Sequence, residues 1–459
     1  MPAENRLGLT IALPGVFTEP IAAPRMSPAA TLLKPGVPER IGKYPVLREL
    51  GQGATSRVFH ARDTFANREV AIKVFVPPNT TDANALRRFQ RVFLNESSLA
   101  GKLNHPHIAA IYDAVTEERY TYLVMEYVAG GTLEQYCAAD TLLPLEKAVE
   151  VIFKCNRALD YAFQHGVIHR DIKPANILLS QGTDIKLSDF GTALQERNTV
   201  TQLSGVGSPA YMSPEQIREE QLTHHTDIYS LGVVIYQLIA GRLPFLGTNT
   251  ASLTYQILNH EAPPLRTLRP DVPEPLERIV MRCLDKTREG RYPTWIDLAK
   301  DLAGAFQALH VGGTNITDAE KFNSAKRLDF FRDFDDVQLW EVVRIATWRA
   351  VARDAIVLRE GDTGDSFFIV GRGEVEVTRG GTYLNTLYTG NCFGEMLYFS
   401  ETTTRRTTTI RALTDGMVVE IRAAALLQAS QGCQNQFNKA FVRILIDRIG
   451  EAHAKLASR

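Results

Sequence analysis

The segment HRDIKPAN, residues 169–176, places three kinds of functional group within one short stretch. The carboxylate of Asp171 can orient a hydroxyl and accept its proton, and the ammonium of Lys173 can neutralise charge on a phosphoryl group in transit. Asn176 can supply an amide oxygen to Mg²⁺, which prefers oxygen ligands, and Asp189 in the following SDFG segment offers a carboxylate to the same metal. Together these groups predict the chemistry of phosphoryl transfer.

Two motifs upstream fit the binding of a nucleotide. GQGATSRV, residues 51–58, lies between two strand-like runs, and Gly51 and Gly53 let the backbone approach phosphates closely. Alone this motif is weak, because a glycine-rich hairpin without a ligand fits it equally well. VAIK, residues 70–73, ends in Lys73, a point cation that can hold the α- and β-phosphates. Its position after the glycine-rich segment favours that role over a solvated strand lysine.

A helix is predicted after the second strand, because apolar residues recur there at helical spacing. These residues are Leu86, Phe89, Phe93, Leu99 and Leu103. Glu96 lies beside this apolar stripe, which must dock on the sheet, so Glu96 is the expected ion-pair partner of Lys73. Glu69, four residues before the lysine, is not the expected partner.

Length and composition exclude several classes of protein. A chain of 459 residues is too long for one ordinary core and predicts two or three domains. Hydrophobic residues at 44% and charged residues at 22% are typical of globular proteins, and a net charge of −1 indicates no nucleic-acid partner and no membrane partner. The five cysteines lack metal-ligand spacing and are expected to be reduced thiols. With no long apolar run and a poor signal-peptide pattern, we expect a cytoplasmic protein.

Changes in pattern along the chain predict four segments. Residues 1–42 are rich in proline and lack periodicity, which is typical of a flexible tail. Residues 43–309 begin with short strand-like runs and continue with helices, as in an α+β domain. Residues 310–325 contain a polar, glycine-bearing stretch that we interpret as a linker, and residues 326–459 form a second domain rich in short strands.

With its motifs in this order, the first domain resembles the eukaryotic-type protein kinase domain. The resemblance implies a bilobal α+β fold, ATP and Mg²⁺ as cofactors, and protein substrates. It assigns catalytic roles to Asp171, Lys173, Lys73 and Glu96, and metal ligation to Asn176 and Asp189. It places ATP against Gly51, Gly53, Val58, Ala71, Lys73, Glu126 and Val128, the last two in a hinge segment. It also implies that Glu215 pairs with Arg291 and that Asp227 braces the catalytic loop.

The resemblance also indicates a substrate class. Lys173 within Asp-x-Lys-Pro, and Ser208 where threonine is common, look like kinases that act on Ser and Thr rather than Tyr. Family members that require arginine near the target carry acids at two positions that hold Thr132 and Ala175 here. We therefore expect no strong requirement for basic residues around the target hydroxyl.

Arg170, next to Asp171, resembles the kinase subgroup whose activation loop is ordered by phosphorylation, since a phosphate can pair with such an arginine. The candidate phosphorylation sites are Thr199, Thr201 and Ser204. The alternative is that these are ordinary loop hydroxyls.

The second domain reads as alternating tight turns and strands, as in EGDTGDSFFIV at residues 360–370 and GEVEV at 373–377. Together with FRDF at 331–334, FGE at 393–395 and RTTT at 406–409, this pattern resembles a cyclic-nucleotide-binding domain, a β-jelly roll with flanking helices. The implied ligand is cAMP or cGMP. The implied contacts are Gly394 for close backbone approach, Glu395 for the ribose, and Arg406 and Thr407 for the cyclic phosphate.

Three residues depart from the pattern of that second family. Leu397 stands where a small residue meets the phosphate, Thr408 replaces an alanine, and Arg405 stands where proline is frequent. Two interpretations therefore stay open: cyclic-nucleotide binding, or a retained fold used for protein contacts.

Two rival functions remain for the whole chain. A catalytically silent scaffold with a sensor or interaction module would have lost Lys73, Asp171 or Asp189, and all three are present. A small-molecule phosphotransferase shares parts of the catalytic loop. The AYMSPE segment, residues 210–215, suits peptide docking and counts against that class.

Overall fold

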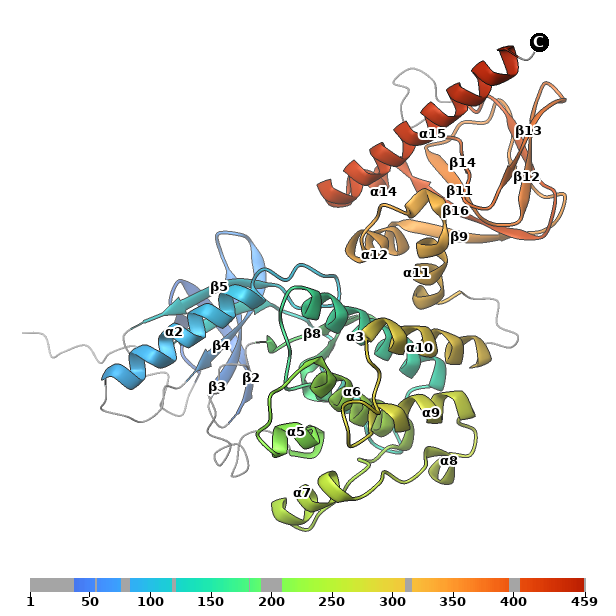
Figure 1. The fold of residues 1–459 in the computed structure, drawn as a ribbon. Helices are drawn as coiled ribbons and strands as arrows, with labels where there is room; N and C mark the ends of the chain where they lie inside the picture. The colour runs from blue at the N-terminus through green and yellow to red at the C-terminus, as the bar shows by residue number, and fades with distance from the viewer. Residues whose placement is uncertain are drawn as a thin grey trace, which may run out of the picture.

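The computed structural model describes residues 37–53, 56–75, 83–117, 121–180, 182–190, 209–309, 316–395 and 405–457. An N-terminal sheet lobe, a helical lobe and a C-terminal β-rich module follow one another along the chain (Figure 1). The candidate phosphorylation sites Thr199, Thr201 and Ser204 lie outside the described residues, as do residues 1–36 of the expected tail.

The first lobe is a six-stranded antiparallel sheet with the strand order β1-β2-β3-β4-β6-β5. Its strands are β1 (Arg40–Ile41), β2 (Tyr44–Gln52), β3 (Ser56–Asp63), β4 (Arg68–Phe75), β5 (Ile111–Thr116) and β6 (Thr121–Glu126). Successive side chains of β4 point to opposite faces, so Ile72 joins one apolar cluster and Ala71 another. Helix α2 (Ala83–Ala100) lies on the Ala71 side, where Phe93 packs against Phe75 with ring centroids 5.3 Å apart.

The second lobe is built around two buried helices, α3 (Leu145–Gln164) and α6 (His224–Ala240). Helix α6 is apolar on almost every side because it is surrounded by other elements. The described residues of this lobe also form α5 (Pro214–Ile217), α7 (Thr250–Asn259), α8 (Leu265–Leu268), α9 (Glu274–Cys283) and α10 (Trp295–Leu309). The hairpin of β7 (Ile177–Leu179) and β8 (Ile185–Leu187), with short 3-10 turns, carries the catalytic segments.

The C-terminal module consists of two four-stranded antiparallel sheets, with the orders β10-β15-β12-β13 and β14-β11-β16-β9. The strands are β9 (Ala346–Val351), β10 (Ile356–Leu358), β11 (Ser366–Arg372), β12 (Glu374–Arg379), β13 (Thr382–Tyr388), β14 (Cys392–Phe393), β15 (Thr409–Ala412) and β16 (Gly416–Arg422). Apolar residues from both sheets share one cluster that includes Phe368, Val375 and Ile410. This is the jelly roll expected from the sequence, after a bilobal α+β domain, so the predicted fold class is confirmed.

Helices flank the jelly roll on both sides in the sequence. Helix α11 (Asp318–Arg327), the turn η5 (Asp329–Phe331) and α12 (Asp336–Ile345) precede it, and α14 (Ala423–Leu427) and α15 (Gln431–Ala457) follow it. Helix α11 begins with a capping box at Thr317 and occupies part of the stretch interpreted as a linker. Helices α11 and α12 lie between the helical lobe and the jelly roll (Figure 1), and their buried residues belong to the same apolar cluster as α3.

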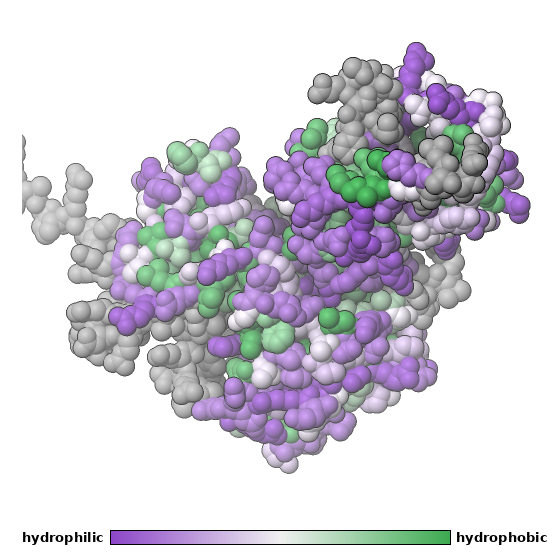
Figure 2. Space-filling view, turned by 45° about the horizontal axis from the view of Figure 1, so that its top comes forward, coloured by the Kyte–Doolittle hydropathy of each residue, from purple (hydrophilic) through white to green (hydrophobic). Residues whose placement is uncertain are grey.

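The surface of the molecule is mixed. Figure 2 shows a face that is mainly hydrophilic, with apolar side chains exposed in small separate groups. Scattered groups of this kind are normal for folded proteins. Within the described residues, no helix is both long enough and apolar enough to cross a membrane.

Candidate functional site

Lys73 and Asp189 meet between the two lobes. Lys73 lies in the middle of β4, opposite Val58 on β3 and Leu123 on β6, and its ammonium is 2.8 Å from Asp189 Oδ2. Burial alone would raise the pKa of Asp189, but the charge and hydrogen bond of Lys73 outweigh it and lower that pKa. Asp189 is therefore ionised, as a carboxylate that binds a metal must be.

Asp171, Lys173 and Asn176 form one hydrogen-bonded cluster. Lys173 Nζ donates to Asp171 Oδ2 at 2.7 Å, and Asn176 Nδ2 donates to the same oxygen at 3.0 Å. Asn176 Nδ2 also donates to the backbone carbonyl of Asp171 at 2.8 Å. These bonds use the amide nitrogen of Asn176 and leave its amide oxygen as an acceptor for a metal. They also leave Asp171 Oδ1 for a substrate hydroxyl.

His169 joins the catalytic loop to the segment that carries Asp189. Its Nε2 donates to the carbonyl of Ser188 at 2.8 Å, and its Nδ1 accepts from the amide of Asp171 at 3.3 Å. The amide of Ser188 in turn donates to the carbonyl of Asn176 at 2.9 Å. The two candidate metal ligands, Asn176 and Asp189, are thus held by one network of short bonds.

Asp227 holds the backbone of the catalytic loop, as the resemblance implies. Its carboxylate accepts from the backbone amides of His169 and Arg170, each at 2.7 Å. Burial raises the pKa of Asp227, although both amides stabilise the ionised form. Arg170 has φ of 65°, a strained value for a residue with a side chain, and Gln216 Nε2 also holds its carbonyl at 2.8 Å.

The expected ion pair between Glu215 and Arg291 is confirmed. It is bidentate, with distances of 2.7 and 2.9 Å, and both side chains are almost fully buried. Burial alone would raise the pKa of Glu215, but the Arg291 guanidinium lowers it. Thr226 Oγ1 adds a further bond to Glu215 at 2.9 Å. This pair fixes α5 to the base of the helical lobe, away from the catalytic groups.

The residues expected around ATP lie along one side of the first sheet. Gly51 pairs with Val58 between β2 and β3, and the amide of Gly53 donates to the carbonyl of Ser56 at 2.8 Å, closing a tight turn. Val58 packs against the apolar cluster that contains Ala71. This arrangement gives an apolar wall beside Lys73, as an adenine base would need.

The segment expected to act as a hinge begins at Glu126, the last residue of β6. The carboxylate of Glu126 is 2.8 Å from Lys186 and accepts from the amide of Ala110 at 3.2 Å. Since its side chain is engaged there, Glu126 would meet adenine through its backbone, and Val128 follows two residues later. Glu96 lies in α2, but its side chain is outside the described ones, so its pairing with Lys73 stays a prediction.

The jelly roll holds a buried arginine that has no acidic partner within the described part of the chain. Arg406 is 6% exposed; its guanidinium donates to Ser366 Oγ at 3.2 Å and to the carbonyl of Gly394 at 3.4 Å. Among the described residues no carboxylate lies within ion-pair distance of it, and burial lowers its pKa. A Cβ on Gly364 would come within 2.5 Å of the guanidinium, and one on Gly394 within 2.8 Å. Both glycines therefore leave room around a cation that can accept an anion.

Glu395 has a partner that the sequence did not indicate. It is 3% exposed, and Arg448 of α15 pairs with its carboxylate. The sequence signal for Arg448 is only its place in a helix, which does not say which strand the helix covers. Thr407 is exposed, and Leu397 lies outside the described residues.

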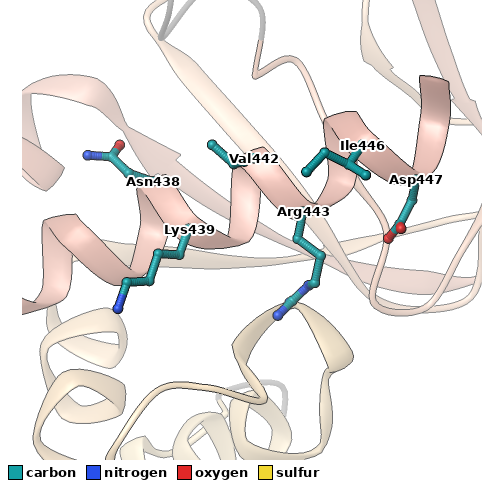
Figure 3. Close-up of a pocket in the computed structure, with 6 residues that line it drawn as sticks. All are labelled: Asn438, Lys439, Val442, Arg443, Ile446 and Asp447. Atoms are coloured by element: carbon teal, nitrogen blue, oxygen red, sulfur yellow. The ribbon is translucent and has the colours of Figure 1, made fainter. Parts of the chain in front are cut away.

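A second arginine of α15 holds the start of the module. Arg443 pairs with Asp333 and donates to the carbonyls of Asp329 and Phe330 at 3.0 and 3.1 Å. Figure 3 shows Arg443 extending from one side of α15 toward a neighbouring segment, while Val442 points away from it. Helix α15 thus connects Glu395 to the turn between α11 and α12.

The chain matches two family models, the protein kinase domain over residues 44–301 and the cyclic nucleotide-binding domain over residues 348–432. It is 36% identical over 294 residues to serine/threonine-protein kinase PrkC of Bacillus subtilis, covering 64% of this chain and 45% of that protein. It is 36% identical over 288 residues to serine/threonine-protein kinase PknB of Mycolicibacterium smegmatis, covering 61% and 45%. The chain therefore spans less than half the length of these relatives. Because the kinase model matches more than half of its residues, this chain belongs to the protein kinase domain family.

Proposed function

We propose that this chain is a protein-serine/threonine kinase that transfers the γ-phosphoryl group of ATP to Ser or Thr hydroxyls of proteins. The observation that carries the proposal is the cluster of Asp171, Lys173 and Asn176, bonded to the segment that contains Asp189. Lys73 pairs with Asp189 at 2.8 Å and completes the set of groups that phosphoryl transfer requires. The names of the relatives, which are Ser/Thr kinases, support the substrate class.

In the proposed reaction, each side chain of the catalytic cluster has its own role in phosphoryl transfer. Asp171 Oδ1 accepts the proton of the attacking hydroxyl while Lys173 and Asn176 hold Oδ2. The hydroxyl oxygen forms a bond to the γ-phosphorus, the bond to the β,γ-bridging oxygen breaks, and ADP leaves with that oxygen. Lys173 stabilises the negative charge on the transferred group. Bound Mg²⁺ would supply charge neutralisation, held by Asp189 and Asn176.

The test is phosphorylation of generic protein substrates with radiolabelled ATP. Asp171→Asn should lower incorporation by roughly 10²- to 10⁴-fold, because the general base is lost and the isosteric amide cannot accept the proton. Asp140→Asn, an exposed acid of the same lobe, serves as the matched control and should leave incorporation unchanged. Equal incorporation by wild type and Asp171→Asn would contradict catalysis at this site and favour the scaffold function.

Regulation by phosphorylation of the activation segment belongs to the same proposal. Arg170 is exposed, and its backbone is held by Asp227 and Gln216, so its guanidinium is available to a phosphate near Asp171. Mass spectrometry after incubation with ATP should find phosphate on at least one of Thr199, Thr201 and Ser204. Its removal by a phosphatase should lower activity. Full activity of the dephosphorylated protein would contradict this regulation.

We propose that the jelly roll binds cAMP or cGMP through the buried Arg406, whose guanidinium keeps N–H donors without a partner among the described residues. The carboxylate of Glu395 would bind the ribose, and the ribose and Arg448 would then share that carboxylate. Titration calorimetry of the full chain should show binding that Arg406→Gln abolishes and Arg405→Gln, at an exposed neighbouring arginine, retains. No heat with either nucleotide at high concentration would favour a module for protein contacts. A ligand regulates the kinase only if it binds two arrangements unequally.

A further inference from the structure

Trp340 of α12 is one of the residues through which the C-terminal module contacts the kinase domain. Trp340 is 1% exposed, and its ring meets the ring of His107 edge-on with centroids 4.6 Å apart. On the other side Trp340 stacks on Phe322 of α11 at 4.6 Å, and Phe153 of α3 lies 6.5 Å away. His107 is therefore packed against a side chain from the second module.

His107 is bonded to the strand that leads into Asp189. It follows α2, and its carbonyl accepts from the amide of Leu187 at 2.9 Å. Its Nδ1 is 3.2 Å from the carbonyl of Ile185, so His107 contacts both ends of β8. The amide of Ala109 donates to the carbonyl of Leu187 at 2.8 Å. Asp189 lies two residues after Leu187. The position of the segment from His107 to Ala109 therefore influences, through β8, the position of this candidate metal ligand.

An ionic network holds the start of the same strand. Lys154 of α3 is fully buried, and its ammonium lies 2.9 Å from Asp184, directly before β8, and 3.3 Å from Asp318 in the first turn of α11. Glu150 is a third partner at 3.2 Å. One turn further along α3, Arg157 pairs with Asp336 in the first turn of α12. Acids at helix N-termini also interact favourably with the helix dipole.

Residues from outside the kinase domain thus reach strand β8 indirectly, Asp318 through Lys154 at the start of the strand and Trp340 through His107 along its side. We infer that Trp340 is a positioning residue for the proposed kinase reaction. Through His107 and β8 it places Asp189, so that helix α12 is a working part of the nucleotide–metal site. Without the indole, a cavity would open beside His107, and the loop would move to fill it. This inference rests on the proposed function only in that Asp189 is taken as the metal ligand.

Calorimetric binding of ADP to the full chain, with Mg²⁺ and with EDTA, tests the inference without relying on catalysis. In Trp340→Ala the gain in ADP affinity due to Mg²⁺ should fall by roughly 3- to 30-fold, while the affinity in EDTA stays unchanged. Trp340→Phe keeps a ring against His107 and should restore most of the gain. Val418→Ala, a buried residue of the jelly-roll core, is the matched control and should not change it.

Asp318→Asn is a second variant that keeps side-chain shape and removes the charge facing Lys154. It should also reduce the gain in ADP affinity due to Mg²⁺, so the inference can still be tested if Trp340→Ala folds poorly. An unchanged gain in folded Trp340→Ala and Asp318→Asn would overturn the inference, and so would an equal loss in Val418→Ala or a wild type without Mg²⁺-dependent binding. A wild type that binds Mg²⁺ and ADP as expected but transfers no phosphate would overturn the proposed function alone.

Discussion

At the scale of single residues, the catalytic loop depends on a backbone conformation that its side chains disfavour. Arg170 and Asp189 both have φ of 65°, in the left-handed region. Such conformations persist only where neighbouring bonds fix them. Here Asp227 accepts a hydrogen bond from the amide of Arg170. Lys73 forms an ion pair with Asp189, and His169 also stabilises the ionised form of Asp189.

Asp227→Asn tests that bracing. Each carboxylate oxygen of Asp227 accepts a hydrogen bond from one backbone amide. An asparagine has only one acceptor oxygen, so its NH₂ group would face one of these two amides. The free energy of unfolding should therefore fall by about 1–3 kcal/mol, as for an unsatisfied buried donor, and phosphorylation should slow. Urea unfolding measures the first effect, with exposed Asp140→Asn as the control. Unchanged stability of Asp227→Asn would show that the two amides do not need this carboxylate.

His107 makes stability depend on pH. Burial lowers its pKa to about 3, and positive charge on Lys154, Lys186 and Arg344 adds to the effect against the bond to Ile185. In the unfolded chain a histidine takes up a proton near pH 6.5, whereas folded His107 stays neutral down to about pH 3. The folded state therefore loses stability as the pH falls between these values, by up to about 1.4 kcal/mol per pH unit from this group.

Urea unfolding between pH 7 and pH 5 measures this slope. His107→Asn should reduce it, and His453→Asn, at an exposed site, should not. His105 lies beside His107, and burial also lowers its pKa, so part of the slope should remain in the variant. Identical slopes in wild type and His107→Asn would mean that His107 is protonated in the folded state as readily as in the unfolded state.

At the scale of elements, α15 connects Glu395, the proposed ribose contact, to the helices that meet the kinase domain. Arg448 pairs with Glu395, and Arg443, five residues earlier in the helix, pairs with Asp333 beside η5. In the proposed complex, a ribose bound to Glu395 would compete with Arg448 for the same carboxylate. Ligand binding and the docking of α15 are thus expected to oppose each other.

Arg448→Gln should therefore strengthen the binding of cAMP or cGMP, by about fivefold or more if Arg448 competes for Glu395. Calorimetry of the full chain measures the dissociation constant. Arg349→Gln, which removes an exposed pair with Glu420 at 3.3 Å, provides a control of equal charge change. Weaker binding by Arg448→Gln would show instead that this arginine assists the ligand.

At the scale of the whole molecule, the kinase domain and the C-terminal module share one apolar core. That core extends from α3 and α6 through α11 and α12 to α15. Lys154 adds a buried charge network across the same boundary; burial alone would lower its pKa, but the three carboxylates raise it. We expect these two parts to unfold in one calorimetric transition.

Lys154→Met tests the network. Its loss leaves Glu150, Asp184 and Asp318 without their shared cation, and breaking such a buried pair destabilises by about 3–5 kcal/mol. Scanning calorimetry should show a lower midpoint, and the transition should broaden or split. Lys300→Met removes a pair that is 72% exposed at the lysine and should cost no more than about 1 kcal/mol. Equal midpoints for the two variants would contradict the role of Lys154.

Much of the catalytic loop could be predicted because its chemistry is local. Asp171, Lys173 and Asn176 lie within six residues, and one turn of backbone brings them together. The partner of Lys73 was harder to predict from the sequence. An apolar stripe indicates which face of α2 docks, but the pair seen among the described residues is with Asp189, 116 positions along the chain.

The sequence by itself determined the two families, the fold class and the order of the catalytic motifs, because short spacings and turn residues encode them. It also indicated a polar linker where the structure has part of α11, since a helix with only Ala319, Phe322 and Ala325 buried looks polar until its partner is known. Only the tertiary structure decided that Arg448 meets Glu395 and that Trp340 meets His107. Helical periodicity tells which side of a helix is buried, but the surface that buries it comes from distant parts of the chain.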